Sequence, residues 1–466
     1  MKFSFKTLGF FFFGLAALNA KTKQPNIVVI LVDDMGYGDL RSFNPESKIP
    51  TPNLDRLAAE GMRFTDAHAP GPLCHPSRYG LMTGRFPFRT DTSKWRKQPL
   101  IEADRLTLPK LLSDNGYQTA MVGKWHLGFE EKGYDKPLKG GPIDQGFDSF
   151  FGIRASTDIP PYFYIRGDQA VMPPSDQINE NYTDGWSKIQ GAFWRGGGIA
   201  PDLKLPDVLP KFTNEACEVL KTRDGDKPLF LYLAYPAPHT PWLPAEEFKG
   251  KSGAGMYGDF MMMVDSEIGR VMATLKEVNM DEDTLVIFTS DNGPVWYPND
   301  VENFEHSSVG TLRGMKGDAW EGGHRMPFIA RWPGKIEKES VSPQTISFTD
   351  CLATIAELLE EKISEDLDSV SFLQALFGKE LPPRSPIVMR SANGTMLVRM
   401  GDWKLIDAKG SGGFSKSSKS KEATAPKGQL YDLSKDLGER KNLYEKMPKK
   451  VEELEKIMKR VINASH

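Results

Sequence analysis

The chain has 466 residues, of which 39% are hydrophobic and 26% are charged, and its formal net charge is -3. This length exceeds what one hydrophobic core usually supports, so we expect one large domain and a smaller one. The slightly acidic balance excludes a general nucleic-acid binder. It also means that an anionic ligand must be attracted by local cations and not by the charge of the whole protein.

The N-terminus has the pattern of a signal peptide over residues 1–20. Two lysines precede an apolar run, residues 8–18, which is too short to cross a bilayer. Alanines near residue 20 suit a cleavage region. No later stretch of the sequence reaches the length of a membrane span. We therefore expect an exported protein, periplasmic or secreted.

Cysteines stand at positions 74, 217 and 351, which are too few for a disulfide framework. Cys217 and Cys351 each lie in a helix-like stretch and are most simply small buried hydrophobic residues. A disulfide between these two could also form. Cys74 lies in a different setting, a motif rich in proline, serine and arginine.

Four short apolar runs predict strands that are buried on both faces: residues 27–32, 118–122, 228–234 and 285–289. Amphipathic stretches between them predict helices, one of which begins at Pro52 and ends before Gly61. This alternation indicates an α/β fold, with a large, mostly parallel sheet flanked by helices on both faces. We expect this domain to span residues 21–383.

The last part of the chain, residues 384–466, has a different composition. Short apolar runs separated by polar turns predict a small α+β subdomain, a short antiparallel sheet followed by an amphipathic helix at residues 448–462. Residues 409–427 are rich in Gly, Ser and Lys, which is typical of a mobile loop.

Residues 130–205 give little periodic signal and predict a long insertion over the functional site. Loops of this length inside a compact domain usually have a function or are disordered. Trp186, Trp194 and Arg195 within it could contact a substrate or could anchor a surface loop. The sequence leaves these two interpretations open.

Polar residues directly follow each of the four predicted strands: Asp33-Asp34, Lys124 with His126, His239, and Asp291-Asn292. Taken singly, each set could be a solvated turn or a core histidine. In a parallel sheet, however, the carboxyl ends of the strands meet at one edge, where ligands bind. Four such sets at equivalent positions therefore predict a single site.

The side chains of this predicted site combine three kinds of chemistry. The three carboxylates and the amide are hard oxygen ligands, which suit Ca²⁺, or Mg²⁺, and not zinc. Arg78, Lys124 and Lys316 add positive charge, and His126 and His239 can transfer protons. Together they suit the cleavage of an ester of a tetrahedral oxyanion, sulfate or phosphate.

Cys74 opens the motif Cys-His-Pro-Ser-Arg at residues 74–78, and Thr-Gly-Arg follows at 83–85. The start of a helix favours negative charge, and Arg78 returns to the same helix face as Cys74. A buried cysteine beside an N-capping serine is the plainer interpretation. The motif, however, resembles the signature of the type I, formylglycine-dependent sulfatases, the arylsulfatase-like members of the alkaline phosphatase superfamily. This resemblance extends over nearly the whole chain, from residue 25 to residues 429–433.

The resemblance implies a nucleophile and a metal site within a catalytic domain. In that family the motif cysteine is converted to formylglycine by a formylglycine-generating enzyme, so Cys74 would be the nucleophile and a further metal contact. The hydrate of this aldehyde has a second hydroxyl, which allows sulfate to be expelled after the transfer. Asp33, Asp34, Asp291 and Asn292 would hold the metal ion, for which calcium is usual.

The resemblance also implies roles for the cations and histidines. Arg78 and Lys124 would orient and stabilise the formylglycine. His126 would be the base that helps the sulfated intermediate to collapse. His239 and Lys316 would bind the sulfate and assist departure of the alcohol. The implied activity is hydrolysis of sulfate esters.

Two other functions compete with this one. A phosphoesterase or phosphonate hydrolase of the same superfamily can share formylglycine and the metal site. A non-catalytic binder of sulfated glycans would need neither the nucleophile nor the histidines.

Export, nine tryptophans and the long insertion favour a sulfated sugar or polysaccharide as the substrate. Several aromatic and basic residues lie near the site motifs in the sequence, and each could contact a sugar or could pack within a loop: His75, Trp95, Arg96, Trp296, His306 and His324.

Overall fold

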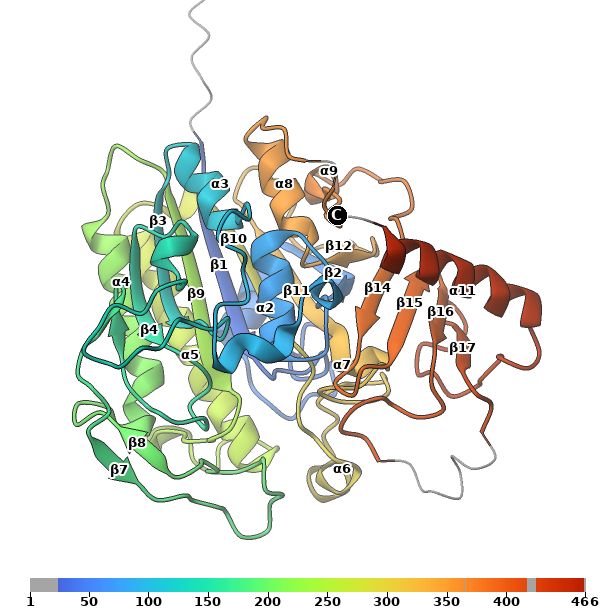
Figure 1. Ribbon diagram of the computed structural model, residues 1–466, viewed down its shortest axis with the longest axis horizontal. Coiled ribbons are helices and arrows are strands. Elements are labelled where there is room, and N and C mark those ends of the chain that lie inside the picture. Colours follow the sequence, from blue (N-terminus) through green and yellow to red (C-terminus); the bar gives the residue numbers. More distant parts are fainter. Residues whose placement is uncertain (1–23, 365, 417–424, 465–466) are drawn as a thin grey trace, which may run out of the picture.

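The computed structural model describes residues 24–364, 366–416 and 425–464. Its centre is a sheet of eleven strands (Figure 1). In spatial order the strands are β12 (Ser340–Ser342), β2 (Met62–His68), β11 (Arg325–Arg331), β10 (Thr284–Ser290), β1 (Asn26–Asp33), β9 (Leu229–Pro238), β3 (Gln118–Lys124), β4 (Ser149–Ile153), β5 (Ile165–Arg166) and β6 (Gln169–Ala170). Strand β13 (Ile346–Ser347) also pairs with β2.

The middle of this sheet is parallel. Strands β10, β1, β9, β3 and β4 run in one direction, whereas β11 is antiparallel to both β10 and β2. Every residue of β1, β9 and β10 is buried, which explains their unbroken apolar sequences. The predicted mostly parallel sheet is therefore confirmed, and the carboxyl ends of its central strands lie at one edge.

Helices cover both faces of the sheet, as predicted (Figure 1). One face carries α1 (Pro52–Ala59), α4 (Val208–Thr222) and α5 (Gly255–Glu277), and the other carries α2 (Cys74–Thr83), α3 (Leu108–Asp114) and α8 (Asp350–Leu358). Apolar residues on one side of each helix, such as Leu54 and Leu57 of α1, are buried against the sheet. Shorter elements lie around this framework: α6 (Pro298–Phe304), α7 (Glu321–His324), α9 (Leu373–Leu376), and the strand pair β7 (Asp176–Ile178) and β8 (Gly197–Ile199).

The C-terminal part forms a second, four-stranded antiparallel sheet beside the first (Figure 1). Its strands are β14 (Ile387–Arg390), β15 (Met396–Met400), β16 (Trp403–Ile406) and β17 (Gln429–Asp432). Helix α11 (Pro448–Asn463) packs Val451, Leu454 and Met458 into one hydrophobic cluster with this sheet. The predicted short antiparallel sheet with a helix is confirmed. The predicted mobile loop falls partly on residues 417–424, which lie outside the described residues.

Cys217 and Cys351 are buried and free, which confirms the simpler prediction for them, and the alternative disulfide between them is not formed. The sequence also predicts that Cys74 lies in a loop just before a helix. In the structure it is instead the first residue of that helix, α2. Among the described residues, no helix is long and apolar enough to cross a membrane. The predicted signal peptide lies outside the described residues.

Candidate active site

Four central strands deliver polar side chains to one edge of the large sheet. Asp33 ends β1, Lys124 ends β3, His239 follows β9, and Asp291 follows β10. All four residues are buried. Because these strands are parallel neighbours, their carboxyl ends place side chains from four distant parts of the chain together.

The turn after β1 directs a second carboxylate to the same place. Asp34 has a φ of +64°, in the left-handed region that aspartate tolerates better than most residues. Its backbone N–H donates to Asp291 Oδ1 at 3.3 Å, and its Oδ1 accepts from Asn292 Nδ2 at 2.7 Å. The residues that follow β1 and β10 are thus joined directly by hydrogen bonds.

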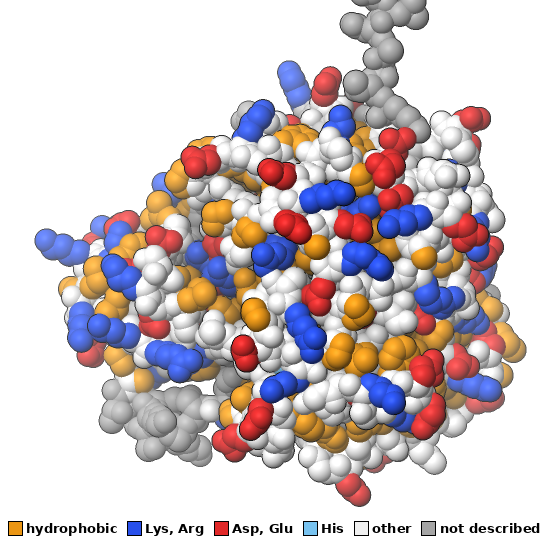
Figure 2. All heavy atoms as spheres, turned by 180° about the vertical axis from the view of Figure 1, so that it is seen from behind, with side chains coloured by type: hydrophobic (Ala, Val, Ile, Leu, Met, Phe, Trp, Pro, Cys, Tyr) orange, Lys and Arg blue, Asp and Glu red, His pale blue; other side chains and the backbone are white. Residues whose placement is uncertain are grey.

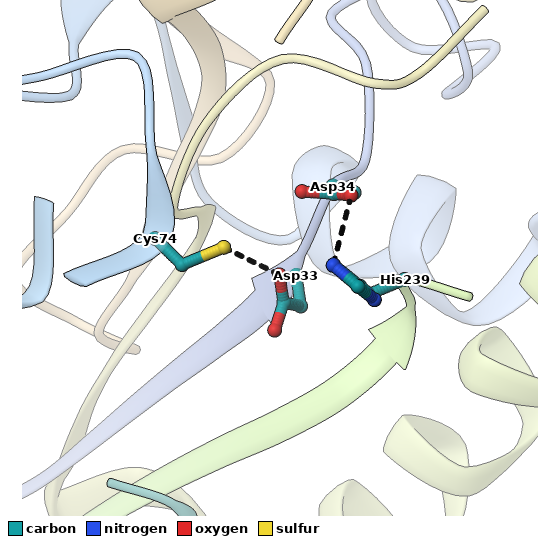
Figure 3. Close-up of side chains that lie close together, drawn as sticks. All are labelled: Asp33, Asp34, Cys74 and His239. Carbon is teal, nitrogen blue, oxygen red and sulfur yellow. Dashed lines mark hydrogen bonds and ion pairs between the residues drawn. The ribbon is translucent and has the colours of Figure 1, made fainter. Parts of the chain in front are cut away.

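Cys74 lies against this group of carboxylates at the N-terminus of α2. Its thiol Sγ is 3.4 Å from Asp33 Oδ1, and Figure 3 shows the side chain pointing toward that carboxylate. Lys316 Nζ lies 3.3 Å from the same sulfur. Burial and the Asp33 carboxylate raise the pKa of the Cys74 thiol well above its ordinary value. The residue is therefore a neutral thiol at pH 7 and, as a thiol, a poor nucleophile.

Each carboxylate has a cationic partner. Lys124 Nζ contacts Asp33 Oδ2, and Lys316 Nζ is 2.6 Å from Asp34 Oδ1. Burial opposes ionisation of Asp33, but the Lys124 ammonium and other nearby cations lower the pKa of this carboxyl below its usual range. Likewise, although burial opposes it, the Asp34 carboxylate raises the pKa of Lys316. Both groups are therefore charged at neutral pH.

Arg78 supports the carboxylates from α2, one helical turn beyond Cys74. Its Nε and Nη2 donate to Asp291 Oδ2 at 3.0 and 2.8 Å, and its Nη1 donates to the Lys124 carbonyl at 3.0 Å. The guanidinium is fully buried. Its Nη2 also donates to Asp33 Oδ2 at 3.4 Å. A planar group held by these hydrogen bonds fixes the spacing between α2, β3 and the residue that follows β10.

The same group of residues suits a divalent cation. Ligand atoms of Asp33, Asp34, Cys74 and His239 all lie within 4.8 Å of one another. Asn292 Oδ1 is buried without a hydrogen-bond partner. Burial and the Asp33 carboxylate raise the pKa of Asp291 to about 6, which shows that carboxylates are crowded there. Oxygen donors, one of them unpartnered, in an acidic and crowded site are the chemistry that Ca²⁺ or Mg²⁺ prefers.

Two histidines flank the group, and they differ in their hydrogen-bond partners. His239 Nδ1 is 2.6 Å from the Thr240 carbonyl, and its Nε2 is 3.6 Å from Asp34 Oδ2 (Figure 3). His126 is buried, and neither ring nitrogen has a hydrogen-bond partner. Burial and the Lys124 ammonium lower the pKa of His126 well below its ordinary value. His126 is therefore neutral and has a free nitrogen that can accept a proton.

A cavity of about 260 Å³ opens onto this group, and Cys74, His126, His239 and Lys316 line it. Three of the expected sugar contacts, His75, Trp95 and Arg96, also line it. The Trp95 ring meets His126 edge to face at 4.3 Å, and the Arg96 guanidinium lies 5.0 Å from the Trp95 centroid. From the long insertion, Arg195 lines the cavity as well, whereas Trp186 stacks on Phe304 and Trp194 donates to the Asn179 carbonyl.

The other three expected sugar contacts do not line the cavity. Trp296 is buried and donates to the His306 carbonyl, and His306 Nε2 lies 2.9 Å from Asp39 Oδ1. His324 is fully buried beside His68, with 3.0 Å between their Nδ1 atoms. Each of these side chains interacts with other protein groups. Although the three residues are near site motifs in the sequence, they do not line the cavity.

Several cavity residues were not anticipated from the sequence. Ser156 Oγ accepts from Lys124 Nζ at 2.6 Å. Asp158 pairs with Arg195 at 2.5 Å, and its Oδ1 has no hydrogen-bond partner. Phe414 reaches the cavity from the C-terminal part. All three lie in segments without helical or strand periodicity, and only the polar, glycine-rich composition there could have drawn attention to them.

Charge on the surface is mixed. On the face drawn in Figure 2, basic and acidic side chains are interspersed and do not gather into one patch. The cations Arg96, Arg195 and Lys316 lie at the cavity. This agrees with the net charge of -3: an anionic ligand would be held by local cations.

Comparison with known proteins identifies the class that this fold and site define. The family model named Sulfatase matches residues 25–361. An N-acetylgalactosamine-6-O-sulfatase of Bacteroides thetaiotaomicron is 33% identical, over 94% of this chain and 93% of that protein. Arylsulfatase A of Homo sapiens is 34% identical, over 92% of this chain and 85% of that protein. The chain belongs to the sulfatase family and is an enzyme of that class.

A solved structure agrees with this assignment. A sulfatase described in work on glycosaminoglycan metabolism by Bacteroides thetaiotaomicron superposes with a TM-score of 0.85 at 32% identity. The match covers 95% of this chain and 100% of that one. The likeness therefore includes the C-terminal sheet as well as the large sheet.

Proposed function

We propose that the protein hydrolyses sulfate esters of a sulfated sugar, using residue 74 as formylglycine and a bound divalent cation. The observation that carries the proposal is the position of Cys74 at the base of the cavity. There it lies 3.4 Å from an Asp33 carboxylate oxygen and 3.3 Å from the Lys316 ammonium. A reactive group at this point would meet both the acidic ligands and the cations that an anionic ester needs.

Conversion of the cysteine supplies the nucleophile. The buried, neutral thiol is poorly suited to attack, as its raised pKa indicates. A formylglycine hydrate would offer a hydroxyl for attack on sulfur and a second hydroxyl for release of the sulfate. Maturation then requires a formylglycine-generating enzyme as a partner.

The oxygen donors of β1 and β10 would hold the cation, with calcium as the first choice and magnesium as the alternative. Asp33, Asp34, Asp291 and Asn292 would form this set, in which Asp34 is hydrogen-bonded to Asp291 and Asn292. Ligand atoms of residue 74, Asp33 and Asp34 lie within 4.8 Å of one another. The ion, when bound, would neutralise negative charge on the sulfate ester. Arg78 and Lys124 keep the carboxylates in place and add positive charge beside residue 74.

Proton transfer falls to the two histidines and a lysine. Neutral His126, with unpartnered ring nitrogens, is suited to take a proton from residue 74 as sulfate is released. His239 and Lys316 both lie beside the Asp34 carboxylate. From there they can bind the sulfate oxygens and donate a proton to the departing alcohol.

A sugar suits the walls of the cavity. Trp95 and His75 provide ring surfaces, while Arg96, Asp158 and Arg195 provide polar groups. Asp158 Oδ1, which has no hydrogen-bond partner and lies 3.9 Å from His239 Nδ1, can accept a hydrogen bond from a hydroxyl group. The relatives named as N-acetylgalactosamine 6-sulfatases make that sulfated sugar the first substrate to test.

The proposal includes the domain boundaries and the export signal that the sequence predicts. We infer that residues 1–20 direct export to the periplasm or the exterior, that residues 21–383 are the catalytic domain, and that residues 384–466 form the C-terminal subdomain. Sequencing the N-terminus of the exported protein tests the first point. A mature chain that still begins at residue 1 would contradict it.

The test of the proposal is sulfate release from N-acetylgalactosamine 6-sulfate and related sulfated sugars. Wild-type protein should release sulfate, and Cys74→Ala should lower kcat by about 10⁴-fold or more. Cys351→Ala is the matched control, since it removes another buried cysteine that does not line the cavity and should keep the activity.

Paired substrates separate the competing functions. The same sugar carrying a phosphate ester should be hydrolysed more slowly than the sulfate ester. Faster release of phosphate would assign the site to a phosphoesterase or phosphonate hydrolase. Binding of the sulfated sugar without turnover, when residue 74 is formylglycine, would assign it to a non-catalytic binder.

A further inference from the structure

A loop of the C-terminal sheet, residues 408–416 between β16 and β17, lies against the active-site segment that carries Lys316. The Ala319 N–H donates to the Ser411 carbonyl at 2.7 Å, and the Ser415 N–H donates to Asp318 Oδ1 at 3.0 Å. The adjoining Ala392 N–H donates to the Gly317 carbonyl at 2.9 Å. The two segments are therefore bound to each other along their backbones.

Glycine makes this contact as close as it is. A Cβ atom at Gly413 would lie 2.1 Å from the Gly317 carbonyl carbon, so no other residue fits there without moving the loop. Gly412, with a φ of +72°, turns the chain into the contact. This geometry determines where the next residue, Phe414, is held.

Phe414 is half-buried, and its side chain lines the active-site cavity. Its ring packs beside Gly317, because a Cβ atom added there would lie 2.9 Å from Phe414 Cδ1. Gly317 directly follows Lys316, whose Nζ is 3.3 Å from Cys74 Sγ. The alcohol part of a sulfate ester bound at residue 74 would lie in the cavity that this ring lines.

The ring adds an apolar surface to a cavity whose lining includes both apolar residues, such as Trp95, and charged groups. Lys316, His239, Asp158 and Arg195 line the cavity with polar atoms. A sugar ring has hydroxyl edges, which suit such groups, and C–H faces, which suit an aromatic face. Phe414 is placed to receive one of those C–H faces.

We propose that Phe414 is a specificity-determining residue, through which the C-terminal subdomain selects the sugar that carries the sulfate ester. The proposal rests on the proposed function. It assigns to Phe414 no part in the sulfur chemistry, which belongs to the residues around Cys74.

The experiment compares the sugar and the sulfate parts of the substrate. For Phe414→Ala we expect KM for N-acetylgalactosamine 6-sulfate to rise about tenfold, which corresponds to about 1.4 kcal/mol. Inhibition by inorganic sulfate, which occupies only the sulfate position, should stay within about twofold of wild type, because one ring contact is lost and no ionic one. Phe414→Tyr keeps the ring face and should retain the wild-type KM.

Two further variants guard against indirect effects. Phe414→Leu fills the space over Gly317 without a flat ring, and KM should rise although the loop stays packed. Phe377→Ala is the matched control, because Phe377 is exposed and packs against Trp332, which follows β11 at the opposite edge of the sheet. Its KM should equal that of the wild type.

Three results would overturn the proposal. The first is an unchanged KM in Phe414→Ala. The second is an equal weakening of inorganic sulfate and sugar, which would give the ring a merely structural role. The third is an absence of sulfate release from any sulfated sugar by wild-type protein, which would remove the proposed function too and so differs visibly from the first two.

Discussion

Two buried clusters of acids, histidines and lysines lie in this protein, and they look alike in composition. The active-site cluster consists of Asp33, Asp34, Cys74, His126, His239, Asp291, Asn292 and Lys316. The junction cluster consists of Asp66, His68, Glu321, His324, Arg399 and Lys404, and it joins β2 and α7 of the large domain to β15 and β16 of the C-terminal sheet. Both clusters include residues whose ligand atoms are close enough together to hold a metal ion.

The clusters differ in how fully their polar atoms are partnered. In the junction cluster, His68 Nε2 is 2.9 Å from Asp66 Oδ1, and His324 Nε2 is 3.1 Å from Lys404 Nζ. In the active-site cluster, both nitrogens of His126 and Asn292 Oδ1 lack hydrogen-bond partners, and a cavity opens beside them. Composition therefore does not distinguish the proposed active site from the junction cluster, whereas unpartnered buried atoms beside a cavity do.

The two buried lysines give the strongest test of this contrast. Lys316→Met should lower kcat by about 10³-fold, because in the proposed reaction the ammonium near residue 74 would stabilise charge on the sulfate ester. Sulfate release per folded molecule measures the effect. Activity close to that of the wild type would remove Lys316 from the reaction.

Lys404→Met should instead reduce stability. Lys404 Nζ lies 3.0 Å from Glu321 Oε1 and 2.9 Å from Glu439 Oε1, all buried. Its loss leaves buried carboxylates without their cation, and the free energy of unfolding should fall by about 3–5 kcal/mol. Denaturant unfolding measures this, and Lys435→Met is the control, since Lys435 is exposed and its loss should change stability by less than about 1 kcal/mol. A Lys404→Met protein that is as stable as the wild type but inactive would contradict the structural role of the junction cluster.

Removal of divalent cations should affect the active-site cluster alone. A chelator should abolish sulfate release, and calcium at about 100 times its Kd should restore activity and add about 2.7 kcal/mol to the free energy of unfolding. Asn292→Ala should weaken this response, because it removes the unpartnered oxygen. His324→Gln should leave the calcium response intact, and loss of the response there would place the ion in the junction cluster.

The junction cluster should make stability depend on pH. Burial lowers the pKa of both His68 and His324, so both are neutral in the folded protein. The unfolded chain gains protons on both histidines below the ordinary histidine pKa of about 6.5, whereas the folded protein gains them only at a lower pH. Stability should therefore fall as the pH drops below about 6.5, by at most about 1.4 kcal/mol per pH unit for each histidine.

Unfolding measured between pH 7.5 and 5 checks this dependence. His324→Gln should reduce the change in the free energy of unfolding with pH by the contribution of one histidine. If the pH dependence of the free energy of unfolding is the same in wild type and variant, His324 has the same pKa in the folded and unfolded protein, which would contradict the account.

The sequence predicted the large sheet and the strand-end residues because the physical signals there are strong. Unbroken apolar runs such as that of β9 occur where a strand is buried on both faces, and parallel strands place the residues that follow them at one edge. The structure brings Asp33, Lys124, His239 and Asp291 together as this rule requires. The catalytic roles of these residues stay predictions.

Part of the site could not be predicted, for two physical reasons. His306 and His324 lie near site motifs along the chain, but a histidine's role depends on its partners in space, and both are satisfied within the protein. Asp158 and Phe414 lie in irregular segments, whose position depends on long-range contacts such as that of Gly413 with Gly317. No periodic pattern encodes such contacts.

The central claim is that sulfate release depends on formylglycine at position 74. The most direct test measures, by mass spectrometry, the fraction of the residue-74 peptide that carries formylglycine in several preparations, alongside the rate of sulfate release. The account predicts a rate proportional to that fraction, with none when the residue is entirely cysteine. Full activity from protein that contains only cysteine at position 74 would contradict it.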